Sequence, residues 1–175
     1  METCKFLASF NFCPKCGGNF VDNNFKSKRC EECGFIYYFN PSSAVVAIIK
    51  NSKGEILVST RGQEPAKGSL DLPGGFVDSY ESGEESVKRE VREECNLEVI
   101  STKYLFSIPN LYNYSNFEVH TLDMFFECVV NDTTTIHADD DVASLQFIAP
   151  KDINLSEFGL KSVRDGLGRY LASCD

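Results

Sequence analysis

The chain has 175 residues, of which 42% are hydrophobic and 12% aromatic, and its formal net charge is −9. This composition supplies a hydrophobic core and excludes a disordered chain. The longest uninterrupted apolar run, residues 44–49, is far shorter than the roughly 20 residues that a membrane helix needs. No apolar segment of a secretory signal precedes the first pair of cysteines. We therefore expect one main domain with a small addition, located in the cytoplasm and without a membrane partner.

The charge is unevenly distributed along the chain. Residues 1–40 carry five Lys and Arg against four Asp and Glu, a balance of +1, whereas residues 41–175 carry 12 against 22, a balance of −10. A surface that binds nucleic acid is normally basic, because its affinity comes from the release of counterions. The larger part of the chain therefore repels polyanions unless a divalent cation intervenes, which argues against a nucleic-acid partner.

Four of the eight cysteines form two CxxC pairs, each followed by glycine: Cys13, Cys16, Cys30 and Cys33. Two such turns present four thiolates to one tetrahedral ion, so the pattern predicts a structural zinc site without an open coordination position. A redox dithiol is the alternative. A segment this short cannot fold alone, and the ion would supply much of its stability. We expect the remaining cysteines to be free thiols: Cys4, Cys95, Cys128 and Cys174.

Aromatic residues flank the cysteine pairs. A small hydrophobic core around the zinc site is a better explanation for them than a platform on which bases stack. The residues concerned are Phe10, Phe12, Phe20, Phe25 and Phe35.

Regular elements are expected after residue 40. The β-branched run 44–50 predicts a buried strand, and residues 51–54 a turn that leads into a second strand, 55–60, to form a hairpin. Residues 62–79 are rich in Gly, Pro and Ser and predict a loop.

A helix is predicted from Ser82 to Cys95. Ser82 and Glu85 are spaced as a capping box, and Asn96 suits a left-handed end. Val87 and Val91 give this helix a narrow apolar stripe.

Further strands are predicted over residues 97–106, 119–130 and 144–148, and a carboxy-terminal amphipathic helix from Ser156 onward. The apolar residues at helical spacing in that helix are Val163, Leu167, Tyr170 and Leu171. Strands interrupted by two helices indicate an α/β sandwich.

Three glutamates of the predicted helix share one face, because Glu90, Glu93 and Glu94 are related as i, i+3 and i+4. A solvated acidic face is one interpretation, and Glu85, Arg89 and Glu93 at i, i+4 intervals support it. Hard Mg²⁺ or Mn²⁺, which prefers carboxylate oxygens and shares its remaining positions with water and phosphates, is the other. The spacing alone leaves both open.

Residues 75–97 resemble the Nudix box, G-x5-E-x7-R-E-U-x-E-E-x-G-U, in which U is bulky and aliphatic. Every specified position matches except the last glycine, which is Asn96, a residue that also adopts the left-handed conformation. The preceding Leu72-Pro-Gly74 resembles the family's entry to the box. Together with the cysteine pairs, the chain resembles the zinc-ribbon Nudix hydrolases that include NADH pyrophosphatases.

The resemblance implies a fold and a set of metal ligands. The fold would be a Nudix α/β/α sandwich with a mixed sheet, residues 41–175, preceded by a four-cysteine zinc ribbon, residues 1–40. Glu90, Glu93, Glu94 and the carbonyl of Gly74 match the family's ligands for Mg²⁺ or Mn²⁺. Arg89 and Glu81 match the pair that braces the loop against the helix.

Nudix enzymes cleave a diphosphate linked to a nucleoside by attack of water on phosphorus, with a carboxylate as the base. Glu93 is our first candidate for this base. Glu118 and the run Asp139, Asp140 and Asp141 are alternatives, although a solvated turn at the start of a strand explains that run better. We assign no catalytic role to His120 or His137.

Aromatic residues interleaved with Asn and Ser follow the box. Tyr112, Tyr114 and Phe117 can stack on a base, and packing of strands and loops explains them equally well. The signature SQPWPFPxS of the NADH pyrophosphatases is missing here. Neither Pro109 nor Tyr114 is spaced from the box so as to decide between ADP-ribose and diadenosine polyphosphates.

The sequence thus predicts a metal-dependent hydrolase that acts on a small nucleotide, namely ADP-ribose, NADH or a similar ADP-containing compound, and releases AMP. One alternative is a pyrophosphohydrolase of nucleoside triphosphates or diadenosine polyphosphates. Another is a Nudix domain that senses a ligand without catalysis, against which the three intact glutamates argue. The resemblance also allows a homodimer.

Overall fold

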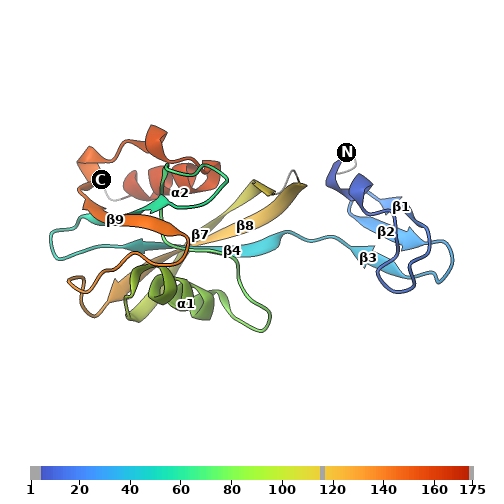
Figure 1. The fold of residues 1–175 in the computed structure, drawn as a ribbon, viewed down its shortest axis with the longest axis horizontal. Helices are drawn as coiled ribbons and strands as arrows, with labels where there is room; N and C mark the ends of the chain where they lie inside the picture. The colour runs from blue at the N-terminus through green and yellow to red at the C-terminus, as the bar shows by residue number, and fades with distance from the viewer. Residues whose placement is uncertain (1–4, 115–116, 174–175) are drawn as a thin grey trace. The chain divides into compact units, whose positions relative to one another are not determined.

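The computed structural model describes residues 5–114 and 117–173, apart from the side chains of Lys5, Phe6 and Tyr114. The chain divides into two compact units (Figure 1). Unit 1 contains residues 1–41 together with 112–120, and unit 2 contains residues 42–111 and 121–175. Cys4 and Cys174, two of the predicted free thiols, lie outside the described residues.

Unit 1 begins with the short 3-10 helix η1 (Lys5–Ser9), followed by three antiparallel strands in the order β1-β2-β3. Their bounds are Phe20–Asn24, Ser27–Cys30 and Ile36–Tyr38. Phe20 packs with two of the cysteines, and Phe35 is partly buried against them. The predicted aromatic core is wrong for Phe12 and Phe25, which are 76% and 46% exposed. A unit this small has too little interior for all its aromatic rings.

Unit 2 contains two three-stranded sheets, in the strand orders β4-β8-β7 and β6-β5-β9. The strand bounds are β4 Ser42–Ile49, β5 Ile56–Arg61, β6 Leu70–Asp71, β7 Val99–Tyr114, β8 Phe117–Val130 and β9 Val142–Ile148. Strand β4 pairs with β8 in parallel, whereas β5 pairs with β6 and β9 antiparallel. The pairing confirms the predicted mixed α/β architecture.

The predicted hairpin over residues 44–60 is wrong. Both strands form, but β4 joins one sheet and β5 the other, and a single bridge between Lys50 and Ile56 connects them. Both strands are apolar on both faces, as strands covered on two sides are. Such a pattern identifies a buried strand but does not reveal its neighbour in the sheet.

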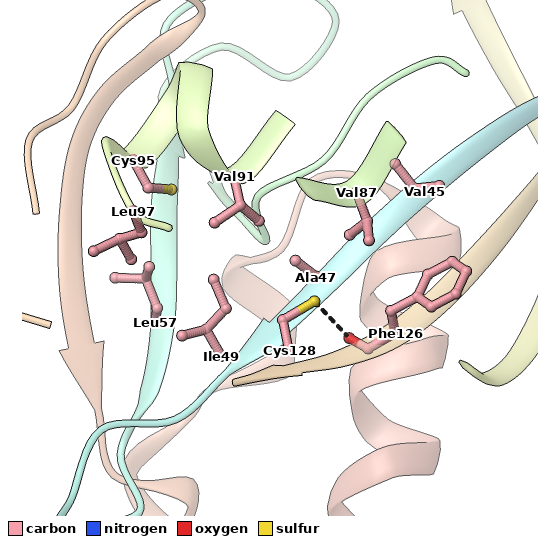
Figure 2. Close-up of a cluster of buried hydrophobic side chains, with 10 residues drawn as sticks. All are labelled: Val45, Ala47, Ile49, Leu57, Val87, Val91, Cys95, Leu97, Phe126 and Cys128. Carbon is pink, nitrogen blue, oxygen red and sulfur yellow. Dashed lines mark hydrogen bonds between the residues drawn. The ribbon is translucent and has the colours of Figure 1, made fainter. Parts of the chain in front are cut away.

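One hydrophobic cluster lies between helix α1 (Gly83–Cys95) and the strands (Figure 2). Val87, Val91 and Cys95 of α1 are all fully buried, which confirms the predicted apolar stripe. The strand residues in this cluster are Val45, Ala47, Ile49, Leu57, Phe126 and Cys128. This packing fixes the rotation of α1 about its axis, and with it the direction of the glutamates that lie beside the apolar stripe.

A second cluster lies on the opposite face of β4 and includes helix α2 (Lys161–Leu171). Figure 1 shows α1 and α2 on the two sides of the strands. Val163, Leu167 and Tyr170 of α2 are buried as predicted. A Cβ on Gly166 would lie 2.1 Å from the Phe125 ring, so this glycine allows the close approach of α2 to β8. Within the described residues, no helix is long and apolar enough to span a membrane.

Several predicted boundaries need correction. The carboxy-terminal helix begins at Lys161 and not at Ser156, because the intervening Phe158 is buried in the core and bridges Leu70, and only the 3-10 helices η2 (Pro150–Asp152) and η3 (Leu155–Glu157) precede it. The predicted loop 62–79 contains β6. Strand β7 continues through the exposed Pro109, which an edge strand tolerates.

The ends of α1 confirm the predicted caps. Ser82 accepts from the backbone N–H of Glu85, and the Glu85 side chain accepts from that of Ser82. Asn96 ends the helix in the left-handed conformation, with φ 55°. The one departure from the Nudix pattern therefore preserves the geometry that glycine would provide.

Replacing Asn96 tests this conformation. Asn96→Ala is expected to lower the free energy of unfolding by about 1 kcal/mol relative to Asn96→Gly, because alanine is strained at positive φ and glycine is not. Both variants lose the hydrogen bond from Asn96 Nδ2 to the Thr135 carbonyl, so their difference isolates the backbone effect. Urea unfolding followed by circular dichroism measures it, and equal stabilities would contradict the assignment.

Candidate active site and metal centre

The four cysteines of unit 1 converge on one point. Their sulfur atoms all lie within 4.8 Å of one another, with Cys13–Cys33 at 3.8 Å and Cys16–Cys30 at 3.5 Å. A tetrahedron with zinc–sulfur bonds of about 2.3 Å has edges of about 3.8 Å. Gly17 and Gly34, which follow the second cysteine of each pair, have φ of 78° and 73° and allow the chain to turn there.

Backbone N–H groups are directed at two of these sulfur atoms. Lys15 donates to Cys13 Sγ and Cys33 to Cys30 Sγ, each at 3.4 Å. The Cys33 N–H lowers the pKa of the Cys30 thiol to about 7, against the opposing effect of burial. A thiolate is the form that binds metal, so the geometry of the four sulfur atoms and the lowered pKa of Cys30 fit a structural zinc ion.

Metal analysis of the purified protein tests this site. We expect one zinc ion per chain, its loss in Cys30→Ser, and its retention in Cys95→Ser, which removes a buried thiol that is not part of the cluster. Chelation should increase hydrogen exchange in residues 10–38, since the ion supplies folding energy. Protein purified under reducing conditions without bound zinc would refute the assignment.

The three glutamates of α1 differ in burial. Glu90 and Glu94 are only 9% and 8% exposed, whereas Glu93 faces solvent. Glu94 Oε2 accepts the backbone N–H of Gly74 at 2.9 Å. A Cβ on Gly75 would lie 2.5 Å from Glu90 Oε1, so Gly75 leaves room for that carboxylate. Two carboxylates of the helix, those of Glu90 and Glu94, thus lie against the Gly74-Gly75 turn, whereas that of Glu93 is exposed to solvent.

The loop before α1 lies along β4. The N–H of Ala47 donates to the Pro73 carbonyl at 2.8 Å, and that of Val45 to the Gly75 carbonyl at 2.9 Å. Gly74 has φ 151°, and a Cβ there would lie 2.1 Å from the Val45 carbonyl oxygen. Only glycine fits at this position, which explains the residue in the motif.

Arg89 connects the loop to the helix. Its guanidinium donates to Glu81 at 2.8 and 3.0 Å, to Glu90 at 2.8 Å and to Glu93 at 3.0 Å. It also donates to the Phe76 carbonyl at 3.0 Å. Arg89 lowers the pKa of Glu81, and these carboxylates raise the pKa of Arg89 above its ordinary value. This arrangement supports a bracing role for Arg89 and Glu81.

The remaining negative charge is incompletely compensated. The pKa of Glu94 is raised to about 8, mainly by burial. The charges of Glu90, Asp71 and Asp140 contribute to the rise, and the Gly74 N–H opposes it. Burial likewise raises the pKa of Glu90, despite Arg89. Among the described residues, only the four cysteines have their ligand atoms within 4.8 Å of one another, so the glutamates are not gathered that tightly.

The alternative bases lie in two places. Asp139, Asp140 and Asp141 are exposed in the turn before β9, and the N–H of Asp139 donates to the Glu94 carbonyl at 3.2 Å. Glu118 lies exposed on β8 in unit 1. His120 is also on β8, and His137 is in the loop before β9. The choice of base among these carboxylates stays a prediction.

The predicted aromatic residues belong to unit 1. Tyr112 is half-buried on β7, and the side chain of Tyr114 lies outside the described residues. The Phe117 ring packs edge-on against Phe10 with centroids 5.8 Å apart. This contact supports packing as the role of Phe117, and base stacking by all three aromatic residues stays a prediction.

Sequence reasoning missed a group of buried polar residues in unit 2. Asp71 and Asp123 are each 6% exposed, Arg61 pairs with Asp71 at 2.5 Å, and Thr121 and Asn110 donate to Asp123. Asp71 is within the segment predicted as loop, and Asp123 interrupts an apolar strand. A charged residue within a buried strand was the signal that could have revealed Asp123.

A mixed α/β/α sandwich whose acidic helix is braced to a Gly-Gly turn is the architecture of a Nudix fold. The family model described as "NUDIX domain" matches residues 40–167, and the chain belongs to this family. A solved structure titled as a NUDIX hydrolase from Nitrosomonas europaea has a TM-score of 0.72 and 21% identity, and the match covers 93% of this chain and 91% of that one.

Curated relatives extend the comparison. An "NAD-capped RNA hydrolase NudC" from Vibrio parahaemolyticus is 31% identical over 58% of this chain and 38% of its own length. The human mitochondrial "NAD(P)H pyrophosphatase NUDT13" is 40% identical over 55% of this chain and 27% of its own. The chain thus matches well under half the length of either relative. These comparisons confirm the predicted membership of the Nudix family.

Proposed function

We propose that the chain hydrolyses the diphosphate linkage of an ADP-containing compound, such as ADP-ribose or NADH, and releases AMP. The observation that carries this proposal is the pair of buried carboxylates, Glu90 and Glu94, at the Gly74-Gly75 turn of a Nudix fold. The names of the NudC and NUDT13 relatives, which refer to NAD and NAD(P)H, support an ADP-containing substrate.

The donor set fits Mg²⁺ or Mn²⁺. These cations prefer carboxylate and carbonyl oxygens, and Glu90, Glu93, Glu94 and the Gly74 carbonyl would provide them. The raised pKa of Glu94 reflects a buried negative charge without a full countercharge, which a divalent cation would supply. When bound, the cation would neutralise phosphate oxygens and increase the acidity of the attacking water.

The chain's own residues would accept the proton of the attacking water and hold the site in place. Glu93, which is exposed and hydrogen-bonded to Arg89, would accept a proton from the attacking water. Arg89 and Glu81 would hold the loop and helix in register and would not touch the substrate. The products would be AMP and the phosphorylated second half of the substrate.

The alternatives predict different products. A nucleoside triphosphate or diadenosine polyphosphate hydrolase would release pyrophosphate or a nucleotide longer than AMP, and a ligand sensor would bind without turnover. Neither a homodimer nor the absence of a nucleic-acid partner has direct support here, and both stay predictions.

A panel of substrates with Mg²⁺ or Mn²⁺ tests the proposal. The panel contains ADP-ribose, NADH, NAD, FAD, diadenosine polyphosphates, nucleoside triphosphates and an NAD-capped RNA oligonucleotide, and chromatography identifies the products. We expect AMP from an ADP-linked small molecule, and no AMP when EDTA replaces the metal. Turnover of triphosphates alone would favour the first alternative. Binding without turnover would favour the sensor.

Charge-neutral variants of the glutamates test the metal assignment. Glu93→Gln and Glu94→Gln are expected to lower turnover by at least about 100-fold, whereas Glu84→Gln, on the exposed part of the same helix, should leave it unchanged. Mg²⁺ should raise the thermal midpoint of the wild type and of Glu84→Gln but not of Glu94→Gln, because a ligand stabilises only the form that binds it.

The same variant makes a prediction about pH. With a folded-state pKa of about 8 against an ordinary 4.5, Glu94 binds more protons when the metal-free chain is folded. Its contribution to stability is therefore lost as the pH rises from about 5 to 8. The free energy of unfolding of Glu94→Gln should therefore decrease less than that of the wild type between about pH 5 and pH 8. A pH slope equal to that of the wild type, or full activity in both glutamate variants, would contradict the assignment.

A further inference from the structure

Asp123 and Phe76, a residue of the Nudix box, lie on either side of the same residue of strand β4. Strand β8 places Asp123 beside Ala44 of β4, and Ala44 on its other side bridges Phe76 of the loop that contains the box. Neighbouring strands are about 4.8 Å apart, so Asp123 is roughly two strand spacings from that loop. Asp123 itself is only 6% exposed, whereas Ala44 and Asn110 beside it are partly buried and Phe76 is exposed.

The Asp123 side chain has neutral partners only. Its Oδ1 accepts the Thr121 hydroxyl at 2.6 Å, and its Oδ2 accepts the Asn110 amide at 3.2 Å. In the described part of the chain, no Lys, Arg or His lies within ion-pair distance of it. A buried carboxylate without a cation is costly.

Asp71 provides a contrast. This buried carboxylate pairs with Arg61 and also accepts the Leu72 N–H at 2.9 Å. Its pKa is raised by burial, against Arg61, and the negative charge of Asp123 contributes to that rise. The fold therefore supplies a cation to one of two neighbouring carboxylates and leaves the other without one. Structural need alone does not explain Asp123.

The charge and hydrogen-bonding capacity of Asp123 limit what it can contact. A carboxylate has about four acceptor positions, and two of those on Asp123 are used. The phosphates of a substrate would be repelled. Hydroxyl and amine donors of an uncharged group would fill the remaining positions.

We propose that Asp123 is a specificity-determining residue that accepts hydrogen bonds from donor groups on the nucleoside half of the substrate. The proposal rests on the proposed function and deepens it. Three donors on an adenosine diphosphate compound have this chemistry: the 2′-hydroxyl and the 3′-hydroxyl of the ribose and the exocyclic amine of the base. A site built to pair with a donor rejects an analogue that lacks it far more strongly than an apolar site does.

The test compares ADP-ribose with three analogues, one lacking the 2′-hydroxyl of its adenosine, one lacking the 3′-hydroxyl of its adenosine and one carrying hypoxanthine in place of adenine. We expect the wild-type protein to discriminate against one of them about 10- to 100-fold in kcat/KM and in Kd. Asp123→Asn should lose that discrimination, with a higher KM for ADP-ribose and a kcat within about threefold of the wild type. The analogue that is rejected identifies the donor.

Two further variants separate recognition from structure. Glu127→Gln changes a carboxylate on the same face of β8 that accepts a hydrogen bond from Tyr170, and it should leave discrimination unchanged. Asp123→Ser keeps one acceptor in a smaller side chain and should also lose discrimination. Because Asp123→Asn removes a buried charge, its thermal midpoint without ligand should equal or exceed that of the wild type.

The outcomes distinguish this proposal from the proposed function. If the wild type treats all three analogues like ADP-ribose, or if Asp123→Asn keeps full discrimination, the role of Asp123 is overturned while turnover of ADP-ribose stands. A lower thermal midpoint with unchanged KM would assign Asp123 a structural role instead. Selective binding of ADP-ribose without turnover, lost in Asp123→Asn, would support recognition and overturn hydrolysis. A wild type that neither binds nor turns over adenosine compounds overturns both proposals.

Discussion

The hydrogen bonds of Arg89 are the constraint on which the rest of the acidic site depends. One guanidinium on α1 holds Glu81 of the preceding loop, Glu90 and Glu93 of the helix, and the Phe76 carbonyl. Without it, the clustered carboxylates would repel one another and the loop would lose its attachment to the helix. A single positive charge cannot balance all of them, however. Burial is the main reason that the pKa of Glu94 is raised to about 8, and the negative charges of Glu90, Asp71 and Asp140 contribute to the rise.

Strand β4 connects the loop of the acidic site to the other elements of unit 2. On one edge it bonds to the loop through Pro73 and Gly75, and on the other it pairs with β8. Its two faces belong to the two hydrophobic clusters, one with α1 and one with α2. The position of the glutamates and that of Asp123 therefore depend on the same strand, so a change in its packing is expected to affect both.

The two candidate metal centres use different ligands for different purposes. The thiolates of unit 1 leave no open position and suit an ion that stabilises a unit too small to fold by its own core. The carboxylates of unit 2 are hard ligands spread over a wider space, which suits a cation that shares its coordination with phosphate oxygens. In the proposed function, such a cation would let the acidic chain bind an anionic substrate that its own charge would repel.

The sequence by itself determined the features that depend on local spacing. These are the CxxC turns, the capping box at Ser82, the left-handed end at Asn96 and the shared face of Glu90, Glu93 and Glu94, because helix period and turn chemistry are properties of neighbouring residues. Tertiary structure alone decided which strands pair, where α2 begins, and which side chains are buried together. The separation of β4 and β5 into two sheets, the pairing of Arg61 with Asp71, and the burial of Asp123 without a cation arise from contacts between distant segments, which no local pattern encodes.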